Sequence, residues 1–233
     1  ISDSLFGINF EQVNRSKIVD NFITSKDLEL GIRGDGIRLW NSHDNQLFAN
    51  RLYKSRDFVL WYSSGNNIEN NYGSYNRYSL HFMYAGRNMV RNNFFEYNSV
   101  GIFFMYSSGT IAIGNTVKNS LGAFGVGIGM KDSSDFTLLE NNLIYNPRGL
   151  YLDQSPYHPR TVNVFERNNI LYNSSGVQFQ VSRERSIFKE NVIKGNKQSL
   201  LKMKELTRPK KANENDFRFY LDETSLDRYS KDV

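Results

Sequence analysis

The sequence contains no cysteine, only four prolines and only three histidines in 233 residues. The absence of cysteine excludes a disulfide framework and any thiolate metal site. No apolar run reaches the roughly 18 residues that a membrane-spanning helix requires, and no signal peptide stands at Ile1. The scarcity of proline, beside 17 glycines and a hydrophobic content of 39%, argues against a disordered low-complexity chain. The sequence therefore predicts a folded protein of one sizeable domain or two small ones.

The net charge of +5 is concentrated near the end of the chain. Between Lys194 and Lys211, seven basic residues stand against the single acidic residue Glu205, so the rest of the chain is near neutral. No aromatic residue interleaves with this basic segment, as a stacking platform for single-stranded nucleic acid would require. We therefore expect a solvated or docking segment here, and no nucleic-acid partner.

One short strand pattern recurs along the chain. A central copy reads Leu80-His81-Phe82-Met83-Tyr84, and the next reads Ile102-Phe103-Phe104-Met105-Tyr106. Seven copies are found, at residues 36–42, 58–63, 79–85, 101–107, 127–133, 149–155 and 176–182. A second column places an asparagine three residues after an apolar residue, at Asn21, Asn50, Asn71, Asn93, Asn115, Asn142, Asn168 and Asn191. The period of about 22 residues indicates a solenoid or another repeat array.

The repeating unit has the composition of β-strands. Its copies are short, rich in Phe, Tyr, Val and Ile, and separated by Asn, Gly and Ser. None has the ten or more residues of helical periodicity that a helical repeat needs. We therefore predict an all-β fold, a parallel β-helix in which each coil of about 22 residues supplies three short strands.

The asparagine columns have a structural reason in such a fold. Asparagine tolerates left-handed turns, and stacked copies pass hydrogen bonds from coil to coil. A further set follows the first in most coils, at Asn76, Asn98, Asn119, Asn146, Asn173 and Asn196. The longer steps between coils predict loops near residues 31–34 and 157–160.

The repeat divides the chain into two parts. Residues 1–196 are predicted to form the β-helix, and residues 197–233 a tail that caps its open end. Within the tail, residues 198–204 have the pattern of a short amphipathic helix. Because Leu5 to Phe10 already resemble a strand of the repeat, we expect a longer natural protein that carries further N-terminal coils and a signal peptide.

Alternation along the principal strand separates an inner from an outer face. The inner column is uniformly apolar and is predicted to be the core: Leu39, Leu60, Phe82, Phe104, Met130, Leu152 and Phe179. One outer column then contains Trp40, Trp61, Met83, Met105, Lys131, Asp153 and Gln180. The other contains Arg38, Val59, His81, Phe103, Gly129, Tyr151 and Gln178.

The stretch from Gly34 to Trp40, with residues 59–63, 80–84 and 149–153, resembles the NosD family. These are periplasmic β-helix proteins of the nitrous oxide reductase maturation system, and the resemblance covers about Leu5 to Asn196. It implies a right-handed parallel β-helix of the repeat type found in carbohydrate-binding proteins and sugar hydrolases. It also implies a non-enzymatic accessory role with an ABC-type transporter and with nitrous oxide reductase or a copper chaperone. The chain would meet the membrane only through these partners.

His81, Met83 and Met105 are the candidate metal ligands, with Trp61 beside them. His81 and Met83 are two residues apart on one strand, so both leave the same face, and Met105 is expected to lie directly above Met83. Imidazole and thioether groups suit Cu(I), which we expect to be bound transiently. The same column is also an apolar patch on which a partner could dock, through Trp40, Trp61 and Phe103, and plain packing is the third reading. His43 and His158 have the contexts of solvated turn residues.

The rival function is that of a carbohydrate-binding or polysaccharide-cleaving β-helix. A glycoside hydrolase needs two carboxyl groups across the scissile bond, and Asp132 with Asp153 is the best pair available. Their repeat positions differ by one, which places them on opposite sides of the sheet, and Lys131 is the simpler partner for Asp153. We therefore assign no catalytic residue. A passive scaffold between transporter and reductase remains a third possibility.

Overall fold

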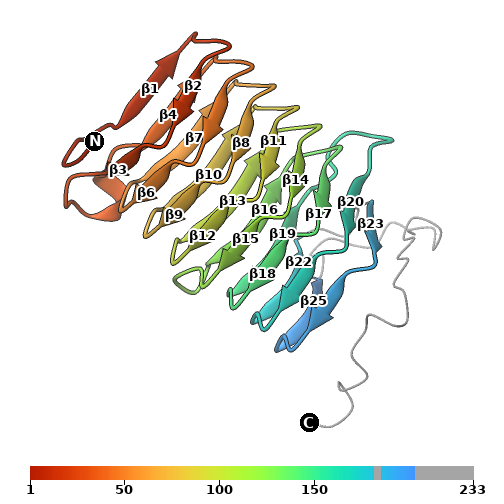
Figure 1. The fold of residues 1–233 in the computed structure, drawn as a ribbon. Helices are drawn as coiled ribbons and strands as arrows, with labels where there is room; N and C mark the ends of the chain where they lie inside the picture. The colour runs from red at the N-terminus through yellow and green to blue at the C-terminus, as the bar shows by residue number, and fades with distance from the viewer. Residues whose placement is uncertain (181–184, 203–233) are drawn as a thin grey trace.

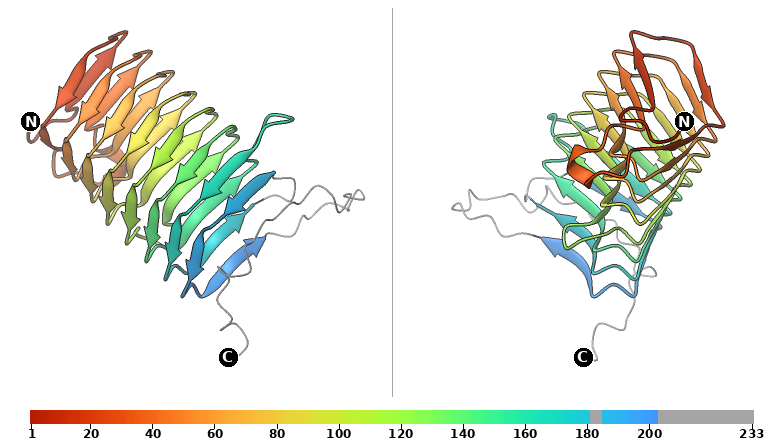
Figure 2. Two further views of the ribbon diagram at one scale, coloured as in Figure 1. Left: turned by 45° about the vertical axis from the view of Figure 1, so that its right-hand side comes forward. Right: turned by 90° about the vertical axis from the view of Figure 1, so that its left-hand side faces the viewer.

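The computed structural model describes residues 1–180 and 185–202. It shows a right-handed parallel β-helix, as predicted, in which three parallel sheets contain nine, eight and eight strands (Figure 1). The coils stack along one axis from β1 at the red end to β25 at the blue end (Figure 2). A single turn of 3-10 helix, η1 (Leu30–Ile32), lies between the third and fourth strands. Within the described residues, no helix is long and apolar enough to cross a membrane.

The nine-stranded sheet contains the longest strands and carries the outer columns predicted above. Its strands, in spatial order, are β1 (Ile8–Glu11), β4 (Ile37–Trp40), β7 (Asp57–Trp61), β10 (Tyr78–Met83), β13 (Val100–Met105), β16 (Val126–Lys131), β19 (Arg148–Asp153), β22 (Ser175–Phe179) and β25 (Gln198–Lys202).

The other two sheets are built from shorter strands. The second sheet contains β2 (Lys17–Val19), β5 (Gln46–Phe48), β8 (Asn67–Glu69), β11 (Met89–Arg91), β14 (Ile111–Ile113), β17 (Thr137–Leu139), β20 (Asn163–Glu166) and β23 (Ser186–Lys189). The third sheet contains β3 (Phe22–Thr24), β6 (Arg51–Tyr53), β9 (Tyr72–Ser74), β12 (Phe94–Glu96), β15 (Thr116–Lys118), β18 (Asn142–Ile144), β21 (Asn169–Leu171) and β24 (Val192–Lys194).

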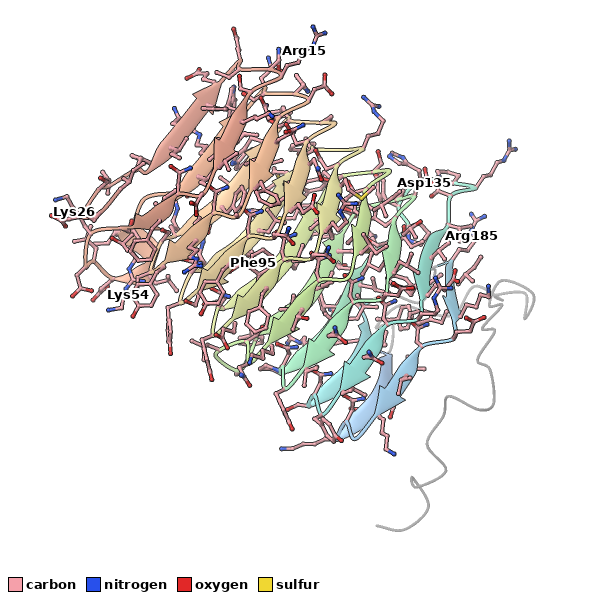
Figure 3. All side chains as sticks on the ribbon, viewed as in Figure 1. Arg15, Lys26, Lys54, Phe95, Asp135 and Arg185 are labelled. Atoms are coloured by element: carbon pink, nitrogen blue, oxygen red, sulfur yellow. The ribbon has the colours of Figure 1, made fainter. Side chains whose placement is uncertain are left out.

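The core is a stack of equivalent apolar residues inside the coils. The predicted inner column is confirmed: Leu39, Leu60, Phe82, Phe104, Met130 and Leu152 are fully buried, and Phe179 is 5% exposed. Phe82 and Phe104 stack with their ring centroids 4.8 Å apart, and Phe136 packs against Phe104 at 4.6 Å. Charged side chains such as Arg15, Lys26, Lys54 and Asp135 project outward instead (Figure 3). The alternation of inward and outward side chains along the strands therefore determines which residues form the core.

Buried asparagines join successive coils through their side chains. The Oδ1 atom of Asn93 accepts hydrogen bonds from the backbone N–H and the side-chain amide of Asn71, both at 2.9 Å. The amide nitrogen of Asn93 donates to the carbonyl of Ile68 at 3.0 Å and to Oδ1 of Asn115 at 2.9 Å. Each asparagine thus satisfies backbone groups that a turn leaves unpaired.

Two positions in the predicted asparagine columns are wrong by one residue. Asn141, not Asn142, continues the first ladder, because its Oδ1 accepts from the backbone of Asn115 at 3.0 Å. In the second ladder Ser120, not Asn119, occupies the equivalent position and donates its N–H to Asn146. The step from Asn115 to Asn141 is 26 residues against 22 in the coil before, and Asn141 and Asn142 stand side by side there. In the second ladder a serine replaces the asparagine, so a search for asparagine selects the neighbouring Asn119.

The structure also contains ladders that the sequence analysis missed. A third asparagine column links Asn45, Asn66 and Asn88, each donating its backbone N–H to the next side chain. A serine column follows the nine-stranded sheet, where hydroxyl oxygens accept backbone N–H groups from the preceding coil. Its members are Ser42, Ser63, Ser107, Ser133 and Ser155.

The predicted helix over residues 198–204 is wrong for its described part. Gln198–Lys202 form β25, which pairs with β22 in the nine-stranded sheet and carries the repeat past residue 196. Residues 203–233, which contain most of the predicted capping tail and part of the basic segment, lie outside the described residues. The loops predicted near residues 31–34 and 157–160 lie between β3 and β4 and between β19 and β20, as expected.

We predict that Asn93→Ala lowers the free energy of unfolding by about 2–4 kcal/mol, because it leaves two donors of Asn71 and the carbonyl of Ile68 buried without partners. Urea denaturation measures this change. Asn92→Gly is the matched control, since Asn92 is an exposed neighbour with a positive φ of 54° that glycine adopts freely. Equal losses in the two variants would contradict the structural role of the ladder.

Candidate functional site

The outer face of the nine-stranded sheet aligns residues that are far apart in the sequence. Trp40 pairs with Trp61, Trp61 with Met83, and Met83 with Met105 in the strand register. Lys131 follows Met105 one rung further along. The outer column predicted from alternation is therefore present, and successive members are one strand spacing apart, about 4.8 Å.

His81 lies in the second outer column but is largely buried. Val59 and Phe103 are its register partners, and only 6% of His81 is exposed. Burial on an outward-facing position arises because Tyr78, at the start of β10, folds back over the imidazole with ring centroids 4.6 Å apart. Alternation along the strand predicts His81 on the open face but does not predict this cover by Tyr78.

The Nε2 atom of His81 faces the sulfur of Met105 at 3.2 Å. The sequence analysis placed His81 beside Met83 on the same strand, whereas this contact runs diagonally to the next coil. For a metal bonded at about 2.0 Å to nitrogen and about 2.3 Å to sulfur, a tetrahedral angle separates the two ligand atoms by about 3.5 Å. The separation of the two donor atoms is thus close to that of a chelating pair, and Met83 lies one rung from Met105.

A buried carboxylate stands on the other side of the imidazole. Asp57 Oδ2 lies 3.7 Å from Nδ1 of His81, and Nδ1 has no hydrogen-bond partner within the described residues. Arg77 binds both carboxylate oxygens of Asp57. A carboxylate at Nδ1 favours a proton on that nitrogen, which leaves the lone pair of Nε2 directed toward Met105.

Opposing effects set the pKa of Asp57. Burial acts to raise it, but the interactions with His81 and Arg77 outweigh burial, so the pKa lies below its ordinary value. Asp57 is therefore ionised at neutral pH, and its negative charge lies 3.7 Å from Nδ1 of His81.

One coil earlier, Asp35 and Arg56 form the same kind of pair without a histidine. Arg56 donates to both carboxylate oxygens of Asp35, at 2.9 and 3.2 Å. Burial nevertheless dominates, and the pKa of Asp35 is raised above its ordinary value. Asp57 differs from Asp35 in having His81 as a second partner, and this interaction helps to lower its pKa.

Aromatic rings border the methionines. The ring centroids of Trp40 and Trp61 are 5.9 Å apart, and Trp61 is one rung from Met83. Tyr62 and Tyr84 stack at 5.1 Å in the turn that follows these strands, and Tyr106 stacks on Tyr84 at 4.9 Å. The open face beside the His81–Met105 pair is thus mainly aromatic and apolar.

Phe103, predicted as a partner-binding residue, is mostly buried and packs against its neighbours. Only 9% of it is exposed, and its ring packs edge-on against Tyr78 with centroids 5.9 Å apart. A Cβ atom on Gly129 would lie 2.3 Å from the Phe103 ring, so a residue without a side chain is needed there. Trp40 and Trp61, in contrast, remain partly exposed.

The other two histidines have local partners. His43 Nδ1 accepts the N–H of Ser64 at 3.1 Å, and Nε2 faces Oδ1 of Asn41 at 3.1 Å. His158 packs edge-on against Tyr157. Across residues 1–180 and 185–202, no three His, Asp or Glu side chains form a group that could hold a metal ion.

Of the two carboxylates weighed for catalysis, one is held in an ion pair and the other lies in a turn. Asp153 pairs with Lys131, at 3.4 Å from Oδ2 to Nζ, as the sequence analysis expected. Asp132 follows β16 in the turn, at a φ of 47°. The residues that sequence reasoning missed are Asp57, Arg77 and Tyr78, which surround His81. The recurrence of arginine in Ser55-Arg56-Asp57 and Asn76-Arg77-Tyr78 was the available signal.

Comparison with known proteins decides the family. The sequence model described as "Periplasmic copper-binding protein (NosD)" matches residues 13–205. The chain belongs to the NosD family. That description gives the family as periplasmic and copper-binding. No curated protein matches the sequence significantly.

The NosD chain shares its fold with solved β-helix structures. The A-module of mannuronan C-5 epimerase AlgE4 from Azotobacter vinelandii superposes with a TM-score of 0.66 at 14% identity, covering 84% of this chain and 59% of that one. The AlgE6 A-module from the same organism gives 0.51 at 13%, covering 84% and 74%. This chain spans about three-fifths of the AlgE4 structure. At such identities the likeness concerns the fold alone.

The raised pKa of Asp35 predicts a pH effect. The unfolded chain loses its proton near the ordinary value of 3.8, whereas the folded chain keeps it to higher pH. The contribution of Asp35 to stability is therefore fully present below pH 3.8 and declines as pH rises through the folded pKa. Asp35→Asn should remove this decline, measured by urea denaturation between pH 3.5 and 7. Asp27→Asn, at an exposed carboxylate, should keep the wild-type slope, and an unchanged slope in Asp35→Asn would refute the assignment.

Proposed function

We propose that this NosD-family chain is a non-enzymatic accessory protein that captures Cu(I) at His81 and Met105 and passes it on during assembly of the copper centres of nitrous oxide reductase. The observation that carries the proposal is the 3.2 Å approach of imidazole nitrogen to thioether sulfur across two coils. The family description supports copper as the metal and the periplasm as the location. The copper here is cargo, held only until a partner takes it.

The chemistry of the site suits a soft cation. Thioether sulfur and imidazole favour Cu(I), and hard cations prefer carboxylate sites. The carboxylate of Asp57 lies 3.7 Å from Nδ1 of His81, and its negative charge favours a proton on that nitrogen, which leaves Nε2 to bind the metal. Met83 offers a further sulfur one rung from Met105, and Trp61 lies where an indole face can shield a soft cation.

The partly exposed edge of the site suits transfer. His81 is buried, but Met83 and Met105 are partly exposed on the outer face. A partner that docks on Trp40 and Trp61 would bring its own ligands to these sulfurs. We therefore place the ABC-type transporter, and nitrous oxide reductase or a copper chaperone, on this face, where aromatic residues and methionine are typical of interfaces.

The polysaccharide-cleaving alternative is less well supported by the same geometry. The nitrogen that would serve as base, His81 Nε2, faces sulfur, and Arg56 and Arg77 occupy the oxygens of Asp35 and Asp57. The structural neighbours include epimerases, but their identity to this chain is only 13–14%. A screen with uronate polymers in the absence of copper tests this alternative, since product release would require an enzyme.

We expect His81→Ala and Met105→Leu each to weaken Cu(I) binding by at least about tenfold, because each removes one donor. Competition with a chromogenic Cu(I) chelator under anaerobic reducing conditions measures the affinity. Met83→Leu should weaken it less than Met105→Leu, since the His81 contact is made by Met105. Met89→Leu, in β11 of the second sheet, is the matched control and should bind as the wild type does. Wild-type affinity in His81→Ala and Met105→Leu would remove both residues from the copper role.

A second prediction concerns docking. The double variant Trp40→Ala/Trp61→Ala should weaken binding to purified transporter subunits by about 30-fold or more, because buried tryptophans commonly dominate interface energies. Biolayer interferometry measures this. Tyr172→Ala, which removes an aromatic ring 50% exposed in a later coil, is the control. Unchanged binding in the double variant would exclude this face as the docking site.

A further inference from the structure

A groove of about 660 Å³ lies on the third sheet, whereas His81 and Met105 lie on the nine-stranded sheet. It crosses β3, β6 and β9, the orange to yellow strands near the first coils (Figure 1). Phe22, Arg51 and Tyr72 follow one another in the register of these strands. Phe22 and Tyr72 are thus two rungs, about 9.5 Å, apart, with Arg51 between them. Tyr53 and Tyr75 also line the groove.

Two of the aromatic rings that line the groove, Tyr72 and Tyr75, are supported by neighbouring rings. Phe94 stacks behind Tyr72 with centroids 5.9 Å apart, and the Tyr72 hydroxyl donates to Glu96 at 2.9 Å. Tyr97 likewise stacks on Tyr75 at 5.5 Å. Phe22 is 57% exposed and makes no aromatic contact within the described residues. Rigid rings that are supported from one side offer contact area at little cost in conformational entropy.

The polar side chains of the groove have free hydrogen-bonding groups. Within the described part of the chain, the side chains of Asp20, Arg51 and Asn70 form no ion pair and no hydrogen bond with the protein. One carboxylate and one guanidinium balance each other in charge, and the amide of Asn70 adds a donor and an acceptor. Such a set matches a ligand that is uncharged and rich in hydroxyl or amide groups.

An extended peptide fits less well. β6 and β9 are paired on both sides, and β3 is the edge strand of the sheet. Ile1 already bonds that edge, because its amino group donates to the carbonyl of Phe22 and its carbonyl accepts the N–H of Thr24, so little of the edge is left for a peptide to extend. Leu52 in the floor is 1% exposed and already packed in the core, which leaves no pocket for an apolar side chain. Flat rings with unpaired hydrogen-bonding groups suit sugar rings, whose apolar faces and hydroxyl edges alternate.

From these observations we infer that the groove of Phe22, Arg51 and Tyr72 binds a neutral glycan chain. Tyr72 and Phe22 contact the sugar rings, and Asp20, Arg51 and Asn70 bind hydroxyl or acetamido groups. The site is separate from His81 and Met105, which lie on the nine-stranded sheet. The inference therefore does not depend on the copper proposal, and either one can fail alone.

Isothermal titration calorimetry of the full chain with N-acetylglucosamine hexamer, cellohexaose and a hexameric uronate tests the inference. We expect binding of at least one neutral hexamer, weaker or no binding of the uronate, and a loss of about tenfold or more in Phe22→Ala and Arg51→Ala. Both replaced side chains are exposed, so the core is untouched. Tyr72→Ala should lose more, with circular dichroism to verify its fold. Tyr172→Ala should bind as the wild type does.

Three results would overturn the assignment. The first is no binding of any neutral hexamer at millimolar concentration. The second is binding that survives both Phe22→Ala and Arg51→Ala, which would place the glycan elsewhere. The third is tighter binding of the uronate, or of an extended peptide that competes with the glycan, since either would assign the groove to another ligand class.

Discussion

The coil-to-coil register is the constraint on which the rest of the structure depends. Three parallel sheets hold every described coil in line with the next, and the asparagine ladders fix that line at the turns. An asparagine such as Asn93 satisfies the backbone of one coil and the side chain of another at once. Because the side chains repeat at each rung, residues separated by one coil in sequence become neighbours in space. His81 and Met105 are such a pair.

The turns beside the nine-stranded sheet show how this register shapes the outer surface. Tyr62, Tyr84 and Tyr106 adopt φ values of 48°, 51° and 50°, a left-handed conformation that costs about 1–2 kcal/mol for a residue other than glycine. Earlier and later coils use Asn41 and Asp132 at the same position, residues that tolerate this conformation well. Stacking between the tyrosines offsets part of the cost in the central coils. In the described coils, the aromatic residues of this turn are therefore those beside Met83 and Met105.

Much of the fold could be predicted from the sequence because each coil repeats the same local pattern. The all-β class, the inner column from Leu39 to Phe179 and the order of the outer column containing Met83 and Met105 follow from alternation and period alone. The placement of Asn142 failed where a longer coil left two adjacent asparagines, and that of Asn119 failed because a serine occupies the ladder position. The strand at Gln198–Lys202 was missed because a short apolar run fits helix and strand equally well.

The site itself could be predicted only in part. Period and alternation put His81 and Met105 on one face, but the diagonal contact between them depends on rotamers that no pattern encodes. The cover by Tyr78 and the carboxylate of Asp57 arise from an irregularity in pairing between β7 and β10, where the register shifts between Tyr78 and His81. A bulge of this kind re-aims side chains without leaving a clear mark in the sequence. The groove on the third sheet likewise depends on side-chain stacking, of Phe94 on Tyr72 and of Tyr97 on Tyr75, that no sequence pattern encodes.

X-ray absorption spectroscopy of the protein loaded with one equivalent of Cu(I) tests the central claim most directly. The account predicts a shell of nitrogen at about 2.0 Å and a shell of sulfur at about 2.3 Å, since one ligand comes from each of two stacked coils. Because the chain has no cysteine, any sulfur in the spectrum must be methionine. A spectrum with nitrogen or oxygen neighbours alone would contradict the pairing of His81 with Met105 as the copper site.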